Sequence, residues 1–423
     1  MTMPSKEVAE EPVAQEEQIR KPALPALPEM GIGLLTGCQD RPYAFGLAMA
    51  LVSQHVKVDI IGGDEIDSPE LHTTPNLRFL NLSGSRTRTR GPLDKSLKLL
   101  SYYWRLMVYA ARSKPAILHI LWNNKIETFD RTFLMLWYKI LGKKIALTAH
   151  NVNQARRDEN DSFLNRVTLR IQYHLTDHIF VHTQKMKEEL IVDFGVDDKD
   201  VTIIRHPIND AFPDTVLTPA EAKRRLGLGE TEKAILFFGR IRPYKGIERL
   251  LEAYQRLAKP GSMYRLILAG EPKKGSEDYL DHIKQSISGL GAGGSIISRI
   301  QFIPDEDMEI YLKGADVLVL PYKEIFQSGV LFLAYTFGLP VVAADVGSFR
   351  EEIVEGKTGF LCKPGDTEDL ANVIEKYFAS DLYKNLPTNR CEIRDYARTV
   401  HSWEAVAGLT RKAYEGFQEK ESR

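Results

Sequence analysis

The stretch FFGRIRPYKGIERLL, residues 237–251, joins the end of an apolar, β-rich run to a segment with helical periodicity. Its loop carries Arg240 and Lys245, and Gly239 and Gly246 let the backbone approach a ligand closely. Two fixed cations between a strand and a helix suit a diphosphate. A basic pair on an isolated loop is more often solvated, but here the strand, the glycines and the helix start occur together.

The same alternation of apolar runs and helical segments extends in both directions from this stretch. The expected strands are residues 31–36, 56–61, 77–82, 117–122, 144–149, 178–182, 201–205, 234–239, 264–270, 299–303, 316–321, 340–345 and 358–362. Such a pattern is typical of parallel sheets covered by helices. It restarts after the polar turn at 206–214, so we predict an α/β protein of two doubly wound Rossmann-like domains facing across a cleft.

The expected organisation is a flexible tail at 1–29, an N-terminal Rossmann-like domain at 30–208, a C-terminal Rossmann-like domain at 209–395 and a C-terminal helix within 396–423 that packs back on the first domain. We expect helices at 246–258 and 403–418, and a third helix with Asp305 as its N-cap. Ligands of doubly wound sheets bind at the carboxyl ends of the strands, so functional residues should lie on the strand-to-helix loops.

Composition excludes several classes of protein. The 423 residues are 43% hydrophobic and 27% charged with a net charge of −1, which describes a globular chain and argues against nucleic-acid binding. Cys38, Cys362 and Cys391 fit neither a disulfide framework nor a zinc site, so we expect a cytoplasmic protein. The most apolar region, 132–142, is too short to span a bilayer, and 1–29 does not read as a signal peptide.

The motif around Arg240 resembles glycosyltransferase family 4, or glycosyl transferases group 1, whose retaining enzymes have the GT-B fold and a G-R-x-x-x-x-K-G motif. The resemblance covers residues 31–418 and includes HPIND (206–210), DVLVLP (316–321) and GLPVVAADVGSFREEIV (338–354). It implies that the domain at 30–208 binds the acceptor and that the domain at 209–395 binds the nucleotide sugar. It also implies that Arg240 and Lys245 hold the donor diphosphate and stabilise the leaving group without a metal.

A second candidate anion site is the helix start in PYKEIFQSGVLFLAYTFGLP, residues 321–340, where free amides and the positive end of the helix dipole meet. The resemblance implies that phosphates and sugar hydroxyls bind here, at Gln327, Ser328, Gly329 and Val330. The family has two glutamates eight residues apart, at positions that correspond to Ile325 and Leu333. Glu324 reaches the sugar only if the loop shifts by one residue, and Leu333 cannot accept hydrogen bonds from the ribose.

The resemblance also implies roles in three other loops. His150 ends the expected strand at 144–149 and would contact the donor sugar, Gly37 would admit the diphosphate and acceptor, and the backbone near Ile303 would contact the base. Asp40 and Arg41 are weaker candidates for the acceptor. The acidic triplet 305–307 reads as helix capping and not as a metal site.

These features predict a retaining, metal-independent glycosyltransferase that moves a sugar from a UDP or GDP donor to a glycan or lipid-linked acceptor, with no other cofactor. Residues 71–157 hold 16 Lys and Arg against three acids. Arg86, Arg88, Arg90 and the segment 96–114 therefore suit either an anionic membrane, at the inner face of the plasma membrane, or a solvated, core-facing helix. A non-catalytic nucleotide-sugar scaffold and a nucleotide-sugar epimerase remain as alternatives, although an epimerase would need cleft carboxylates beyond Glu324.

Overall fold

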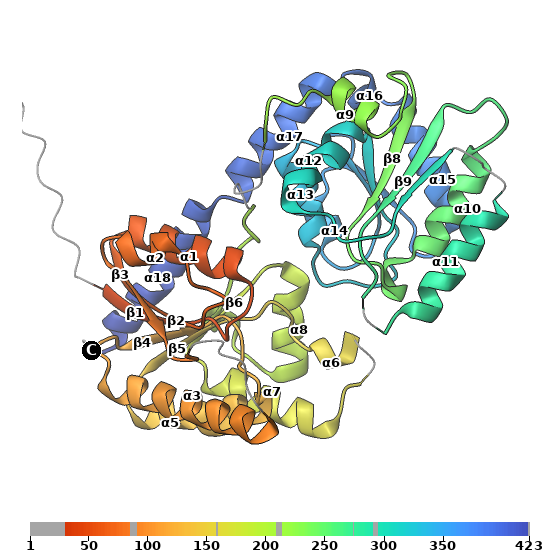
Figure 1. The fold of residues 1–423 in the computed structure, drawn as a ribbon. Helices are drawn as coiled ribbons and strands as arrows, with labels where there is room; N and C mark the ends of the chain where they lie inside the picture. The colour runs from red at the N-terminus through yellow and green to blue at the C-terminus, as the bar shows by residue number, and fades with distance from the viewer. Residues whose placement is uncertain are drawn as a thin grey trace, which may run out of the picture.

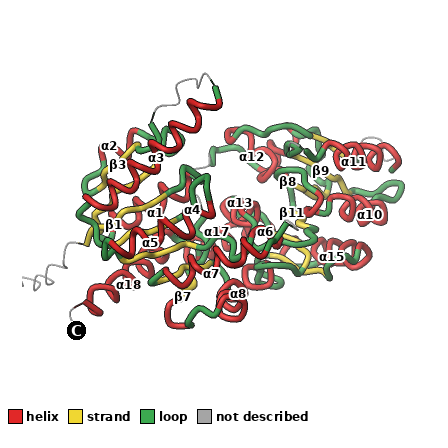
Figure 2. The backbone as a smooth tube through the Cα atoms, turned by 90° about the horizontal axis from the view of Figure 1, so that it is seen from below, coloured by secondary structure: helices red, strands yellow, loops and turns green. Residues whose placement is uncertain are grey.

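The computed structural model describes residues 30–84, 91–157, 160–208, 214–273, 275–290 and 295–421. They form two lobes, each built on one parallel β-sheet with helices on both faces (Figures 1 and 2). The predicted class of two doubly wound α/β domains is confirmed.

The sheet of the first lobe has the strand order β3-β2-β1-β4-β5-β6-β7. Its strands are β1 (Met30–Leu35), β2 (Val56–Gly62), β3 (Leu77–Asn81), β4 (Ile117–Ile120), β5 (Lys144–Thr148), β6 (His178–Val181) and β7 (Val201–Ile203). Its helices are α1 (Arg41–Ser53), α2 (Pro69–Thr73), α3 (Pro92–Arg112), α4 (Glu127–Phe129), the π-helix η1 (Asp130–Leu134), α5 (Met135–Ile140), α6 (Gln154–Arg157), α7 (Phe163–Leu175), α8 (Gln184–Phe194) and the 3-10 turn η2 (Asp198–Asp200). The strand order reverses between β1 and β4, which places the expected ligand site at their carboxyl ends.

The sheet of the second lobe has the order β10-β9-β8-β11-β12-β13. Its strands are β8 (Lys233–Phe238), β9 (Tyr264–Ala269), β10 (Ile296–Arg299), β11 (Val317–Leu320), β12 (Val341–Ala344) and β13 (Gly359–Cys362). Its helices are α9 (Pro219–Arg225), the 3-10 turn η3 (Pro243–Lys245), α10 (Ile247–Leu257), α11 (Glu277–Gly289), α12 (Asp305–Gly314), α13 (Gly329–Thr336), α14 (Phe349–Glu352), α15 (Thr367–Ala379), α16 (Asp381–Lys384) and α17 (Leu386–Val400). Here the order reverses between β8 and β11, so the loop that carries Arg240 lies at the switch point.

Three local predictions were wrong. The strand expected at 299–303 is β10, which ends at Arg299, because its partner β9 ends at Ala269 and leaves later residues unpaired. Helix α10 begins at Ile247, since Gly246 has a left-handed φ of 64°. Asp305 is the first residue of α12, and Pro304 is its N-cap.

The chain crosses back to the first lobe after α17, and α18 (Trp403–Glu421) packs against α1 (Figure 1). Trp403 lies so close to Gly46 that a Cβ there would be 2.2 Å from the indole ring. Tyr414 contacts the buried His119 of β4, with 2.5 Å between its hydroxyl and Nδ1. The boundaries at residues 29, 208 and 395 stay a prediction, and α17 continues through the last of them to Val400.

Candidate active site

A cavity of about 550 Å³ lies at the carboxyl edge of the second sheet, and we call it the donor cavity. Gly239, Arg240 and Lys245 line it from the loop after β8, and Gly329 and Val330 line it from the start of α13. A Cβ on Gly239 would stand 3.1 Å from both Lys245 Nζ and Val330 Cγ2. The structure therefore brings together two segments that are more than 80 residues apart in sequence. Pro42 of the first lobe also lines this cavity.

Lys245 is the most deeply placed cation of the donor cavity, with only 6% of its surface exposed. Its Nζ lies 5.1 Å from the ring centre of Tyr322 and 6.0 Å from that of Phe237. Among the described residues no carboxylate forms an ion pair with it. Burial lowers the pKa of Lys245 to about 8. A buried ammonium without a counter-ion is a strong site for an anionic ligand.

Arg240 and the start of α13 complete the cationic side of the donor cavity. Arg240 is mostly exposed, and its Nε lies 3.6 Å from Glu271, a distance that leaves the guanidinium available to a ligand. Ser328 is the N-cap of α13 but makes no capping hydrogen bond through its side chain. The amide of Leu331 donates to the carbonyl of Ser328 at 3.1 Å, whereas those of Gly329 and Val330 have no hydrogen-bond partner among the described residues and are free to bind an anion. Gln327 is half-buried next to them, and its Nε2 has no partner among the described residues.

Other predicted site residues lie outside the donor cavity. Glu324 is exposed and lines a separate cavity of about 480 Å³ together with Lys185. Ile325 is buried in the core of the second lobe. Ile303 is buried in the same core, and Met308 lines the donor cavity instead.

Leu333 faces the donor cavity as an apolar wall. Within the described residues, no group of three or more His, Cys, Asp or Glu side chains is arranged to hold a metal ion.

His150 follows β5 and lines a cavity of about 180 Å³ in the first lobe, beside Gln39 and Asn123. Its ring stacks on Trp122 at 4.2 Å with an interplanar angle of 4°. Burial and neighbouring imidazoles hold the pKa of His150 well below the usual range, so its ring is neutral. Its Nδ1 lies 3.0 Å from Nε2 of His182.

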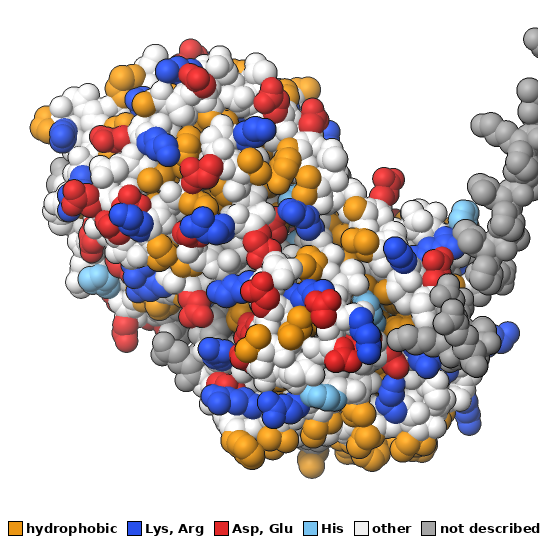
Figure 3. Space-filling view, turned by 180° about the vertical axis from the view of Figure 1, so that it is seen from behind, with side chains coloured by type: hydrophobic (Ala, Val, Ile, Leu, Met, Phe, Trp, Pro, Cys, Tyr) orange, Lys and Arg blue, Asp and Glu red, His pale blue; other side chains and the backbone are white. Residues whose placement is uncertain are grey.

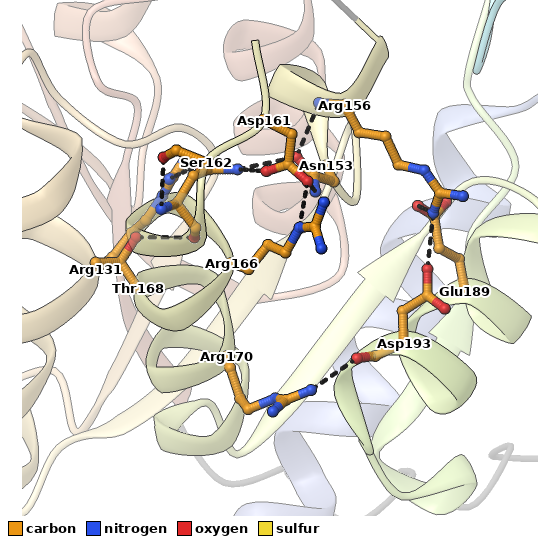
Figure 4. Close-up of polar contacts among 11 residues, drawn as sticks. Arg131, Asn153, Arg156, Asp161, Ser162, Arg166, Thr168, Arg170, Glu189 and Asp193 are labelled. Atoms are coloured by element: carbon orange, nitrogen blue, oxygen red, sulfur yellow. Dashed lines mark hydrogen bonds and ion pairs between the residues drawn. The ribbon is translucent and has the colours of Figure 1, made fainter. Parts of the chain in front are cut away.

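Hydrogen bonds and ion pairs hold the loop between β5 and α7 in place (Figure 4). Asn153 donates a hydrogen bond of 3.1 Å to Asp161, which also accepts one of 2.7 Å from Arg166 of α7. Arg156 pairs with Asp193 of α8 at 2.9 Å. These contacts hold the backbone that follows His150 against two helices.

The loop after β1 is shaped by backbone sterics. Gly37 has a φ of 56°, and a Cβ there would stand 2.7 Å from the carbonyl oxygen of Asn123, so only glycine fits. Asp40 is the N-cap of α1, and its Oδ1 accepts a hydrogen bond of 3.2 Å from the amide of Tyr43. Asp40 therefore has a structural role, and Arg41 is exposed as the first residue of α1.

Sequence reasoning missed a cluster of aromatic rings between the donor cavity and the cavity beside His150. Tyr43 contacts His150, His182 and His206, with ring centres 4.7, 5.9 and 5.7 Å away. His206 also lines the donor cavity and stacks on Phe332 of α13. The available signal was a histidine at or after the end of each of three adjacent strands, β5, β6 and β7.

Two protein-family models match the chain. Residues 42–212 match the family model described as Glycosyltransferase Family 4, and residues 220–398 match Glycosyl transferases group 1. D-inositol 3-phosphate glycosyltransferase of Mycobacteroides abscessus is 30% identical over 347 residues, which is 78% of this chain and 75% of the relative.

Two solved structures share the fold. Sucrose-phosphate synthase of Thermosynechococcus elongatus has a TM-score of 0.71 at 19% identity, over 93% of this chain and 100% of its own. HepE of Anabaena in complex with UDP has a TM-score of 0.70 at 17% identity, over 92% and 100%. The two family models together span most of the sequence, and the chain is therefore a member of glycosyltransferase family 4, an enzyme with the GT-B fold that uses a nucleotide-sugar donor.

Proposed function

We propose that the chain transfers a sugar, with retention of anomeric configuration, from a nucleoside-diphosphate sugar in the donor cavity to a hydroxyl of a glycan or lipid-linked acceptor. The observation that carries this proposal is the convergence of Lys245, Arg240 and the free first amides of α13 on one cavity. A diphosphate is the part of the donor that such a cluster binds best.

The same groups provide the catalysis. When the bond from the sugar C1 to the diphosphate oxygen breaks, its electron pair stays on the diphosphate. Arg240, Lys245 and Gly329 line the cavity that receives this charge, and their cationic groups and amide stabilise it. The acceptor hydroxyl attacks C1 from the face that the diphosphate leaves, and its proton passes to a phosphate oxygen. A new C1–O bond then forms on the original face, which retains the configuration.

Two positions of this donor site differ from the family pattern. Leu333 presents no acceptor for the ribose hydroxyls, so either another group binds the ribose or the donor complex is weaker by that contact. Glu324 lies in a different cavity, and it reaches the sugar only after its loop shifts. If it does so, Glu324→Gln should lower turnover more than it lowers affinity for the nucleoside diphosphate.

We propose UDP as the nucleotide in preference to GDP. HepE, which shares the fold, was solved with UDP and with UDP-glucose, which supports the choice. The sequence relatives named D-inositol 3-phosphate glycosyltransferase support a polar, hydroxyl-bearing acceptor. The base is expected near Met308, which lines the donor cavity on the side of α12.

The acceptor is proposed to lie at a membrane, because one face of the first lobe is apolar. Most of the exposed large hydrophobic side chains gather on it, and they form what we call the α3/α5/α7 face: Leu93, Leu97, Leu100, Trp104, Phe133, Leu136, Ile140, Phe163, Leu164 and Val167. Figure 3 shows hydrophobic side chains along the lower edge of this lobe with Lys and Arg beside them. No helix in the described part of the chain is long and apolar enough to span a bilayer. We infer peripheral binding at the cytoplasmic face of an anionic membrane.

The experiment that tests the function is a transfer assay with UDP-sugars and GDP-sugars, with release of nucleoside diphosphate and the anomeric configuration of the product as readouts. Arg240→Ala and Lys245→Ala should each lower turnover by roughly a hundredfold or more. Arg249→Ala, a cation on α10 that does not line the donor cavity, is the matched control and should retain activity.

Wild-type protein that binds UDP but releases none from any donor would support the scaffold alternative. Variants at Arg240 and Lys245 within about twofold of wild type would refute the assignment of the diphosphate site.

A further inference from the structure

The protonation of His182 is determined by its surroundings. Its Nδ1 lies 3.0 Å from the carbonyl oxygen of Ile204, the residue that follows the neighbouring strand β7. A carbonyl oxygen only accepts hydrogen bonds, so this nitrogen carries a hydrogen atom. The side chain is almost completely buried, and burial lowers the pKa of His182 to about 3. A neutral imidazole has one N–H group, and Nε2 of His182 therefore has a free lone pair.

This lone pair determines the protonation of His150. Nε2 of His182 is 3.0 Å from Nδ1 of His150, and one of two hydrogen-bonded nitrogens must donate. Because His182 cannot donate from Nε2, the hydrogen atom is on Nδ1 of His150. The neutral ring of His150 then has its lone pair on Nε2.

That Nε2 atom is buried and has no hydrogen-bond partner among the described residues. An unpaired buried acceptor is costly in a folded protein and points to a ligand. The ring borders the cavity of about 180 Å³, and its stacking on Trp122 and the edge of Tyr43 prevent it from rotating freely.

We propose that His182 is a positioning residue that holds His150 in its Nδ1–H tautomer, so that Nε2 of His150 accepts a hydrogen bond from a hydroxyl group of the transferred sugar. Only the identity of this ligand rests on the proposed function. An Nε2 atom without hydrogen repels groups that only accept, such as a carboxylate. His182 therefore makes the site selective for neutral, hydroxylated sugars over sugar acids with a carboxylate at that position.

The tautomer can be measured on the protein without any donor. Two-bond ¹H–¹⁵N correlation spectra of protein labelled with ¹⁵N-histidine distinguish the two tautomers, and His150→Phe assigns the signal. Wild-type His150 should have its hydrogen on Nδ1. His182→Phe keeps an aromatic ring but removes both hydrogen bonds, and it should move the hydrogen to Nε2. His182→Gln can accept from His150 and should restore the original form.

His178→Phe, a ring substitution at the other end of β6, should leave the His150 signal unchanged. A wild-type spectrum with hydrogen on Nε2 of His150 overturns the proposal, whichever donor the enzyme uses.

The selectivity is tested with UDP-glucose and its monodeoxy and monofluoro analogues. His182→Phe should lower kcat/KM for UDP-glucose roughly tenfold, the effect of one lost hydrogen bond, with UDP affinity unchanged. For wild type, kcat/KM should be lower with one deoxy analogue than with UDP-glucose. This difference should disappear in His182→Phe and return in His182→Gln. An equal loss for all analogues would indicate a merely structural role and would overturn the selectivity. Absence of any transfer despite the Nδ1–H tautomer would count against the proposed function instead.

Discussion

Oε2 of Glu352 lies 3.3 Å from Nε2 of His401, at the point where the chain crosses back to the first lobe. Both side chains are buried, and Nδ1 of His401 donates a hydrogen bond of 2.9 Å to the carbonyl of His206. Two lone pairs that face each other in the protein interior need one proton between them. Burial raises the pKa of Glu352 to about 7, although Arg205 at 3.8 Å opposes this, and burial lowers the pKa of His401 to about 4. Below about pH 7 the carboxyl therefore holds the proton.

This pair predicts that stability falls as pH rises through 7. The pKa of folded Glu352 is above its ordinary value of 4.5, so its contribution is full below 4.5 and is lost by about pH 7. The lowered pKa of His401 makes stability rise with pH between about pH 4 and 6.5 and offsets this loss there. The net loss of stability is therefore seen above pH 6.5. Glu352→Gln, whose amide donates to His401 at every pH, should abolish that loss. Melting temperatures of wild type and variant from pH 6 to 8.5 test this, and parallel curves would contradict it.

Nucleotide binding should weaken at alkaline pH because Lys245 binds as an ammonium ion. Burial lowers its pKa to about 8, so the fraction of free protein that is ready to bind a diphosphate decreases as pH rises through 8. Lys245→Arg keeps its charge over this range and should give a flatter profile. Calorimetric titration with UDP from pH 6.5 to 9.5 measures both proteins. Identical profiles would mean that Lys245 does not contact the diphosphate.

Gly239→Ala should reduce UDP affinity more than it reduces stability. The φ of Gly239 is 109°, and the added methyl group would stand 3.1 Å from Lys245 Nζ, inside the donor cavity. The backbone strain costs about 1–3 kcal/mol. Gly195→Ala is the control, because Gly195 also has a positive φ, of 71°, but no atom within 4 Å of the added carbon. Equal losses of UDP affinity in the two variants would show that strain alone is responsible.

The sequence predicted the site best where its geometry is local. Gly239, Arg240 and Lys245 lie within one strand–loop–helix unit, and the glycines and periodicity determine how that unit folds. The strand predicted at 299–303 was wrong because its true limits depend on where β9 ends, which is a property of the partner strand.

The hydrogen bond between His150 and His182 also could not be predicted from the sequence. The two residues are 32 positions apart and meet only because β5 and β6 are adjacent in the sheet. The position of Glu324 could not be predicted from the sequence either. This carboxylate is one residue away from the family position, and it lines another cavity. Loop paths of this kind depend on contacts between distant segments, as between Ile325 and Gly347.

The α3/α5/α7 face predicts peripheral binding to anionic vesicles. On α3 the exposed side chains Leu93, Leu97, Leu100 and Trp104 follow helical spacing, so they form one stripe on the surface. The sequence left open whether segment 96–114 faces a membrane or a core. In the structure Tyr102, Tyr103, Leu106 and Ala110 of α3 pack in the core of the first lobe, so the helix is core-facing on that side. The prediction of membrane binding rests on the exposed stripe at the other positions of α3. Apolar side chains contribute by insertion, and each basic residue near the surface adds on the order of 1 kcal/mol.

Co-sedimentation with phosphatidylglycerol-containing vesicles should decrease with salt and in the double variant Leu97→Glu, Trp104→Glu. Val192→Glu is the matched control, since Val192 is 79% exposed on α8, outside the α3/α5/α7 face. Replacing Arg86, Arg88 and Arg90 with Ser should also weaken binding, although these positions lie outside the described residues. Wild-type protein that stays in the supernatant at low salt would refute a membrane partner. A concentration-dependent dimer that Trp104→Glu dissociates would assign the face to a second copy of the chain, because only burial against a protein surface would then explain so much exposed apolar area.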